Sequence, residues 1–245
     1  MKKFLIVCCG IMLSSCAGEM QFDYSKKTDA EIYEEGLKQF KKENLTSAIE
    51  AFKQVEYNHP YSPLVAKSWI MAGYSYYKAK KYSDAIEQFD RLLKFQPNHP
   101  QADYANYMIA ISYYDQISPV TRDQKMTEMA LKKMMDLVKK YPSSKYAEDV
   151  KPKLTIANNN LAGKEMYIAK NLVKKKNIIA GLNRYQTVLK KYETTVFVPE
   201  ALFRTIEIYD MIGDKEEVKN MLRLLEVNYP DSEWYKTAKK TYSSI

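Results

Sequence analysis

The sequence is poor in the residues that build reactive sites. Its 245 residues include only three cysteines and two histidines. They contain no glycine-rich phosphate loop, no HExxH or GxSxG motif and no spaced set of Cys and His residues. Each histidine, His59 and His99, stands between Asn and Pro, a context typical of a turn rather than of a metal site or a catalytic dyad. We therefore predict no catalytic site, no metal and no cofactor.

The N-terminal segment differs in composition from the rest of the chain. Lys2 and Lys3 precede an apolar stretch at residues 4–13, which is far too short to span a bilayer. This order of a basic and then an apolar region predicts a signal peptide over residues 1–15. Two of the three cysteines lie within that segment, so its removal leaves Cys16 alone and excludes an intramolecular disulfide.

The residues around Cys16 resemble a bacterial lipobox. The sequence LSSC at residues 13–16 directly follows the apolar stretch, and the cysteine of a lipobox receives diacylglycerol on sulfur and a palmitoyl chain on its amino group. The alternative is an ordinary secretory signal that happens to contain a cysteine. Ala17 stands where an Asp would resemble an inner-membrane retention signal. The resemblance therefore implies a lipid anchor in the outer membrane, joined to the fold by a tether at residues 16–28.

Glycine is also scarce, with seven residues, and no run rich in Val, Ile and Thr alternates as a strand would. Small and aromatic residues instead recur at helical spacing, as in the tetratricopeptide repeat (TPR), a helix–turn–helix unit of about 34 residues. Three columns of residues keep their register through five units. They are Ala48, Ala85, Ala130, Gly181 and Val218; Phe52, Phe89, Met134, Tyr185 and Leu222; and Val55, Leu92, Leu137, Val188 and Leu225.

These columns predict an all-α TPR solenoid of five helix–turn–helix repeats followed by a C-terminal capping helix. We expect repeats one to three over residues 29–142, and repeats four and five with the capping helix over residues 143–245. Asp29 precedes the first apolar run and is expected to cap the first helix. Repeat three contains an enlarged loop at residues 115–122. Such a loop marks a binding face or reflects neutral drift in length, and the sequence leaves both interpretations open.

The chain is basic, with 38 Lys and Arg against 30 Asp and Glu. Loss of Lys2 and Lys3 with the signal peptide lowers its formal net charge from +8 to +6. Basic runs such as residues 174–176 occur in proteins that bind nucleic acid. An exported lipoprotein does not meet nucleic acid, and we predict no such partner. These lysines are interpreted mainly as solvated surface and as favourable charge at helix ends. Contact with acidic partner surfaces or with lipid headgroups is the alternative that stays open.

Tyrosine is abundant, with 21 residues. The first helix of each TPR lines the concave face of the solenoid, and tyrosines occupy its inward positions in the register given above. Such a wall suits an extended peptide, because Tyr combines apolar area with a polar tip. The alternative is that these rings fill grooves between helices. The predicted peptide-binding residues are Tyr33, Tyr74, Tyr77, Tyr104, Tyr107 and Tyr114.

Several longer strings resemble the BamD family, lipoproteins of the machinery that assembles β-barrel proteins in the outer membrane (the BAM complex). They are HPQADYANYM at residues 99–108, SYYDQI at 112–117, LAGKE at 161–165, NRY at 183–185 and YPDSEWY at 229–235. The likeness spans the lipobox and all five repeats, and it is of the alphaproteobacterial type. Glu193 stands where other repeats end in Pro, and Pro152 falls within a long helical stretch. These departures concern contacts made by loops rather than the family.

The resemblance implies a non-enzymatic scaffold on the periplasmic face of the outer membrane. Family members bind a POTRA domain of the barrel subunit BamA through their C-terminal repeats. Arg184 matches a family arginine on that side, the alternative being a solvated surface residue. The N-terminal repeats are thought to engage the C-terminal β-signal of unfolded outer-membrane proteins, and other BAM lipoproteins are further partners. A different function is also open: an envelope TPR adaptor that serves peptidoglycan or polysaccharide export.

Overall fold

The computed structural model describes residues 23–242. The signal peptide, Cys16 and most of the tether lie outside the described residues. Within that range the chain forms eleven α-helices and a short 3-10 helix, η1 (Tyr24–Lys26), and no strand. The α-helices are α1 (Asp29–Lys41), α2 (Leu45–Asn58), α3 (Leu64–Lys78), α4 (Tyr82–Phe95), α5 (Ala102–Tyr114), α6 (Lys125–Lys140), α7 (Lys145–Lys174), α8 (Ile178–Lys191), α9 (Val198–Ile212), α10 (Lys215–Asn228) and α11 (Glu233–Thr241).

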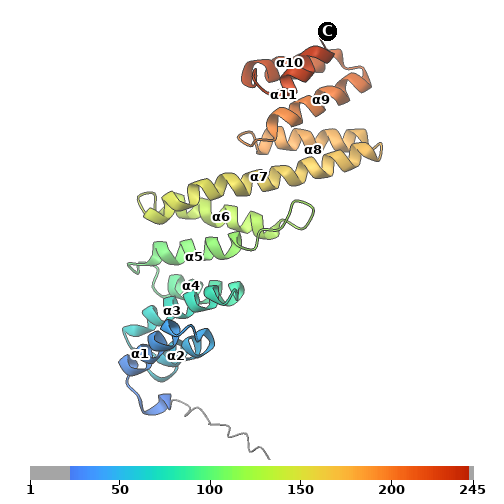
Figure 1. Cartoon of the computed structure of the whole chain (residues 1–245). Helices are drawn as coiled ribbons and strands as arrows, with labels where there is room; N and C mark the ends of the chain where they lie inside the picture. The colour runs from blue at the N-terminus through green and yellow to red at the C-terminus, as the bar shows by residue number, and fades with distance from the viewer. Residues whose placement is uncertain (1–22, 243–245) are drawn as a thin grey trace, which may run out of the picture.

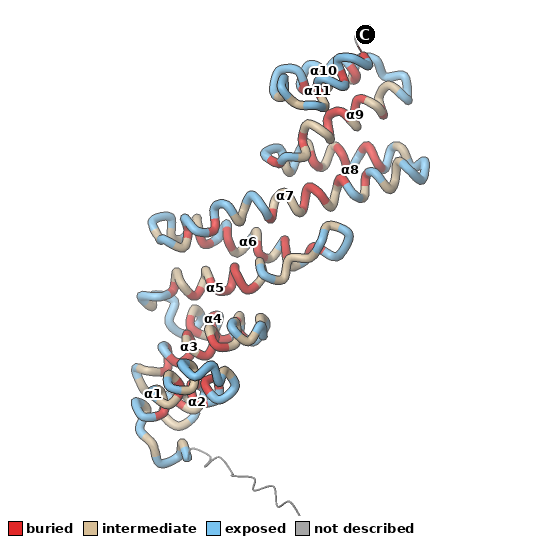
Figure 2. The backbone as a smooth tube through the Cα atoms, in the orientation of Figure 1, coloured by how far each residue is buried: buried red, intermediate tan, exposed pale blue. Residues whose placement is uncertain are grey.

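Consecutive helices pair as antiparallel hairpins, and the hairpins stack in chain order from α1/α2 to α9/α10 (Figure 1). The last helix, α11, packs on both α9 and α10. The all-α solenoid of five repeats with a capping helix is thus confirmed. Buried residues run along the whole stack rather than gathering at one centre (Figure 2), as expected when each repeat buries its apolar face on its neighbours.

The three columns read from the sequence are the interior of this stack. Every member is buried except Leu222, which is half-buried in the last repeat. In repeats one and two, the large residue of the second column packs against a glycine on the first helix of the same repeat. A Cβ atom on Gly73 would stand 2.9 Å from the Phe89 ring, and one on Gly36 would stand 2.6 Å from the Phe52 ring. The two helices of these hairpins therefore approach closely only because a glycine faces a phenyl ring.

The start of α1 differs from the expectation that Asp29 caps it. Thr28 is the capping residue: its hydroxyl accepts from the Glu31 backbone N–H at 3.2 Å, and the Glu31 carboxylate accepts from the Thr28 backbone N–H at 2.9 Å. Asp29 is the first helical residue, and its carboxylate accepts a hydrogen bond of 2.5 Å from the Ser62 hydroxyl instead. Both residue types are good caps, but Glu31 three residues after Thr28 completes a capping box and identifies Thr28. Only the contact of Asp29 with Ser62 is distant in sequence.

The long helix α7 belongs to two layers at once. Residues from Tyr146 to Ala157 pack with α5 and α6, whereas residues from Ala162 to Val173 pack with α8 and α9. The enlarged loop before α6 is attached to its middle: the Asn160 amide donates to the Ser118 carbonyl at 3.1 Å, and the Lys164 ammonium donates to the Arg122 carbonyl at 3.0 Å. The loop is thereby held against α7.

We expect Gly73→Ala to lower the free energy of unfolding by about 1–3 kcal/mol, because the added methyl group must displace the Phe89 ring. This loss exceeds the gain of up to about 1 kcal/mol that Ala brings over Gly in a helix. Denaturation followed by circular dichroism measures it. The control is Gly73→Ala in a Phe89→Leu background, where the loss should shrink. An equal loss in both backgrounds would show that the ring is not the obstacle.

Candidate functional site

The six tyrosines predicted to bind peptide lie on the first helices of repeats one to three, and all six are half-buried. Tyr33, on α1, lies against the ring of Phe52 in its own repeat, with ring centroids 5.5 Å apart. Tyr74, on α3, lies 5.6 Å from Phe40 of the preceding repeat and stacks on Tyr77 at 6.4 Å. These rings therefore form a row along the first helices α1, α3 and α5, which we call the tyrosine-lined face, and some of them also join one repeat to the next.

Two of the tyrosine hydroxyls bridge neighbouring repeats. The Tyr77 hydroxyl donates to Oδ2 of Asp115 at 2.7 Å, and the Tyr107 hydroxyl donates to Oδ2 of Asp149 on α7 at 2.9 Å. Burial first, and then the hydrogen bond to the carboxylate, raises the pKa of both the Tyr77 and the Tyr107 phenol. A phenol is a protonated donor at neutral pH in any case, and the raised pKa keeps both hydroxyls protonated further into the alkaline range.

The structure adds Tyr146, which the sequence analysis did not select. It is the second residue of α7, and its ring lies 4.8 Å from Tyr107 in a stacked arrangement and 5.4 Å from Tyr104. Lys145 Nζ lies 5.0 Å from the centroid of the same ring. The signal in the sequence was an aromatic residue at the start of the helix that follows Pro142. The tyrosine-lined face thus extends from repeat three into repeat four.

The six predicted residues do not form a single cluster. Five of them pack against the core of repeats one to three. Tyr114, at the end of α5, packs against the next core cluster, which Tyr77 and Tyr107 also contact. Burial raises the pKa of Tyr104, whose ring meets Phe89 edge-on at 6.1 Å. The face is therefore a row of partly covered rings rather than a set of fully exposed side chains.

Arg184 lies on α8, in the second half of the stack. Its Nη1 atom lies 3.0 Å from Oε2 of Glu165 on α7, and 46% of its side chain is exposed, against 16% for Glu165. The ion pair holds one side of the guanidinium and leaves part of it open to solvent. An arginine fixed in this way can still present donors to a carboxylate of another molecule.

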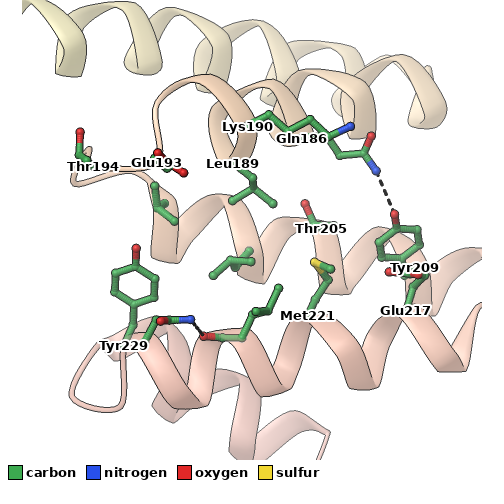
Figure 3. Close-up of a pocket in the computed structure, with 14 residues that line it drawn as sticks. Gln186, Leu189, Lys190, Glu193, Thr194, Thr205, Tyr209, Glu217, Met221 and Tyr229 are labelled. Atoms are coloured by element: carbon green, nitrogen blue, oxygen red, sulfur yellow. Dashed lines mark hydrogen bonds between the residues drawn. The ribbon is translucent and has the colours of Figure 1, made fainter.

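A groove that the sequence analysis missed lies between α8 and α10, with α9 as its floor (Figure 3). Its volume is about 690 Å³. The apolar lining comes from Leu189, Val198, Leu202, Met221 and Leu224. The rim includes Lys190 and Glu193, the residue that replaces the usual terminal Pro, and Gln186 donates to the Tyr209 hydroxyl at 2.9 Å. The replacement of Pro by Glu193 is the feature of the sequence that could have pointed to this groove.

The two histidines take part in turns, as expected. His59 Nε2 donates to the Lys27 carbonyl at 2.8 Å, and His99 Nδ1 accepts from the Gln101 backbone N–H at 3.1 Å. Between residues 23 and 242, no group of three His, Cys, Asp or Glu side chains is arranged to hold a metal ion. In the same part of the chain no helix has the length and apolarity needed to cross a membrane.

Comparison with known proteins gives consistent matches over most of the chain. The model of the YfiO family, described as outer membrane lipoprotein, matches residues 25–224. The outer membrane protein assembly factor BamD of Caulobacter vibrioides is 37% identical over 91% of this chain and 74% of its own length. BamD of Rickettsia prowazekii is 34% identical over 94% of this chain and 91% of its own length.

Among solved structures, the TPR2AB domain of yeast Sti1, determined as a complex with pHSP90, is similar with a TM-score of 0.44. It is 11% identical and covers 87% of this chain and 83% of its own.

The hydrogen bond between Tyr107 and Asp149 should contribute to the free energy of unfolding. Tyr107→Phe keeps the ring and removes the hydroxyl, and we expect it to lower the free energy of unfolding by about 1 kcal/mol. The Lys153 ammonium, and then the Tyr107 hydroxyl, hold the pKa of Asp149 below its ordinary value of 3.8. A lowered pKa means that the contribution is full above pH 3.8 and is lost as the pH falls through the lowered pKa.

The difference in unfolding free energy between the wild type and Tyr107→Phe should therefore be constant near neutral pH and shrink in acid. Denaturation at several pH values measures it. Tyr114→Phe, on the same helix, is the control, because among residues 23–242 no hydrogen bond from its hydroxyl is found. A difference that is as large for Tyr114→Phe, or that grows in acid, would contradict the role given to the Tyr107 bond.

Proposed function

Because this chain belongs to the YfiO family of outer membrane lipoproteins, we propose that it is an outer membrane protein assembly factor that acts as a binding scaffold and not as an enzyme. The observation that carries this proposal is the row of tyrosines along the first helices of stacked hairpins. Such a stack offers an extended surface without any need for chemistry. Its partners in the BAM complex are the barrel subunit BamA and other lipoproteins.

The scaffold is held at the periplasmic face of the outer membrane by acyl chains on Cys16, after removal of residues 1–15. A single acyl chain binds a membrane only marginally, whereas two or more anchor a protein stably. The S-diacylglycerol and N-palmitoyl groups expected at Cys16 together meet that requirement. The sequence motif LSSC at residues 13–16 supports the anchor.

The first three repeats, over residues 29–142, bind the C-terminal β-signal of unfolded outer-membrane proteins. A β-signal is an extended segment with aromatic and apolar side chains at alternating positions. Tyr74 and Tyr114 are the best placed to contact it. Tyr77 and Tyr107 already bond to carboxylates of the neighbouring repeat. Burial raises the pKa of Tyr33 and Tyr104, whose phenols are shielded from solvent. In this proposal the bridging tyrosines fix the geometry of the face, and the others provide apolar and hydroxyl contacts.

The remaining repeats, over residues 143–245, bind a POTRA domain of BamA with Arg184 at the contact. The ion pair with Glu165 supports this role, since it orients the guanidinium while leaving part of it exposed. The groove between α8 and α10 lies on another side of α8, where Gln186, Leu189 and Lys190 point. A partner bound at Arg184 leaves that groove free.

We expect Tyr74→Ala with Tyr114→Ala to weaken binding of a β-signal peptide by about tenfold, which corresponds to about 1.4 kcal/mol. Fluorescence anisotropy of a labelled peptide measures the dissociation constant. The matched control is Tyr57→Ala, an exposed tyrosine on α2 outside the row, which should leave the affinity unchanged. Equal affinities for the double variant and the wild type, with both folded, would assign the rings to packing alone.

The Arg184 contact is tested by two single variants at one ion pair. Both Arg184→Ala and Glu165→Ala break the ion pair between these two residues. Only Arg184→Ala also removes the donor offered to BamA. We expect Arg184→Ala to weaken capture of a purified POTRA domain about tenfold, and Glu165→Ala to preserve it. Lys190→Ala, on the groove side of α8, controls for loss of positive charge. Equal losses for Arg184→Ala and Glu165→Ala would reduce the arginine to a structural residue.

A further inference from the structure

Three large aromatic side chains stand exposed together at the N-terminal end of the solenoid, a surface that we call the aromatic edge. Tyr57 lies at the end of α2 and is 81% exposed, Tyr61 lies in the loop after it and is 100% exposed, and Phe95 ends α4 and is 61% exposed. A shallow hollow of about 300 Å³ is bordered by both Tyr61 and Phe95. Tyr61 and Phe95 therefore share one surface across repeats one and two, and Tyr57 lies four residues before Tyr61.

The aromatic edge is held by a firm scaffold. Behind Phe95, the Trp69 ring lies 5.8 Å away, and its Nε1 donates to Glu56 at 2.9 Å. Arg91 donates to the other oxygen of Glu56 at 2.6 Å and thereby compensates its charge. The exposure of Phe95 consequently does not come from a loosely packed helix end, because its support is an apolar and ion-paired cluster.

The same edge is joined to the point where the N-terminal segment enters the fold. Ser62 bonds to Asp29, and His59 bonds to the carbonyl of Lys27, so both sides of Tyr61 are tied to residues 27–29. Asp23, where the described chain begins, follows Cys16 by seven residues. Seven residues span at most about 25 Å. A lipid group on Cys16 thus keeps this end of the solenoid near the membrane surface.

The chemistry of the edge suits the headgroup region of a bilayer. Lys53 precedes Tyr57 by one helical turn and is exposed, and Lys94 Nζ lies 5.5 Å from the Phe95 ring centroid. Aromatic rings prefer the interface between lipid and water, where lysine stems lie along apolar surface and their ammonium groups meet anionic lipid. The hollows beside Tyr61 are shallow and open, and such a surface is suited to a layer of headgroups.

We propose that Tyr57, Tyr61 and Phe95 insert into the headgroup layer of the membrane that holds the lipid anchor. This inference rests on the acylation of Cys16 in the proposed function. Attachment through the lipid anchor alone gives one point of contact with the membrane and does not fix the orientation of the solenoid. A second contact through the aromatic edge fixes which side of the first repeats faces the membrane and which side remains open to partners.

The test uses full-length acylated protein in vesicles of phosphatidylethanolamine and phosphatidylglycerol. Tyr61→Cys introduces a single free thiol, because two natural cysteines lie in the signal peptide and the third is acylated. A nitroxide attached there reports collisions with oxygen, which concentrates in lipid, and with a water-soluble nickel chelate. The matched control is Val227→Cys on α10, far along the stack, where the Val227 residue is 69% exposed. Tyr57→Cys provides a second position on the edge.

We expect labels at residues 61 and 57 to lose collisions with nickel and to gain collisions with oxygen when vesicles are present, and the label at residue 227 to change little. Equal nickel access at residues 61 and 227 on acylated protein overturns the proposal. Protection that requires the assembled BAM complex and not lipid alone also overturns it, in favour of a protein partner. Mass spectrometry that finds no acyl chain on Cys16 instead defeats the lipid anchor itself, and the inference with it.

Discussion

The close approach of a glycine to a phenyl ring sets the geometry on which the first half of this molecule depends. In repeats one and two, Phe52 and Phe89 occupy the space that a side chain on Gly36 or Gly73 would need. The two helices of each hairpin are thereby drawn together, and the first helices of successive repeats come side by side. That spacing brings Phe40 within reach of Tyr74, and Tyr77 within reach of Asp115. The tyrosine-lined face is a consequence of the hairpin packing behind it.

The tyrosines of that face serve two demands that compete. A ring that stacks on the next repeat stabilises the solenoid, and a hydroxyl bonded to a carboxylate is no longer offered to a ligand. Tyr77 and Tyr107 meet the first demand through their bonds to Asp115 and Asp149. The mixture explains why all six rings are half-buried. A fully exposed row would bind more readily but would be held less firmly, and ordering it on binding would oppose affinity.

Much of the fold was predictable from the sequence because a repeat states the same packing rule several times. Each column of small or apolar residues was read from five copies, and a single irregular member such as Leu222 did not obscure it. Features that depend on one contact between distant residues were not predictable. The cap of α1 is not among them, since Glu31 three residues after Thr28 is the local signature of a capping box, whereas the bond between Asp29 and Ser62 could not be foreseen. The contacts of Tyr146 and the groove over α9 likewise arise from how neighbouring repeats meet, which no local pattern records. The attachment of the enlarged loop to Asn160 and Lys164 has the same origin.

The thirty residues of α7 form a continuous rod, about 45 Å long at 1.5 Å per residue, with Pro152 inside its first half. Its two halves belong to different layers, so the length of α7 sets the distance and the rotation between those layers. Deleting one residue near its middle would turn everything downstream by about 100° and shift it by about 1.5 Å. Arg184 and the last repeat would then be oriented differently relative to the tyrosines of repeats one to three. The number of residues in α7 therefore fixes the direction in which the second half of the stack faces relative to the first.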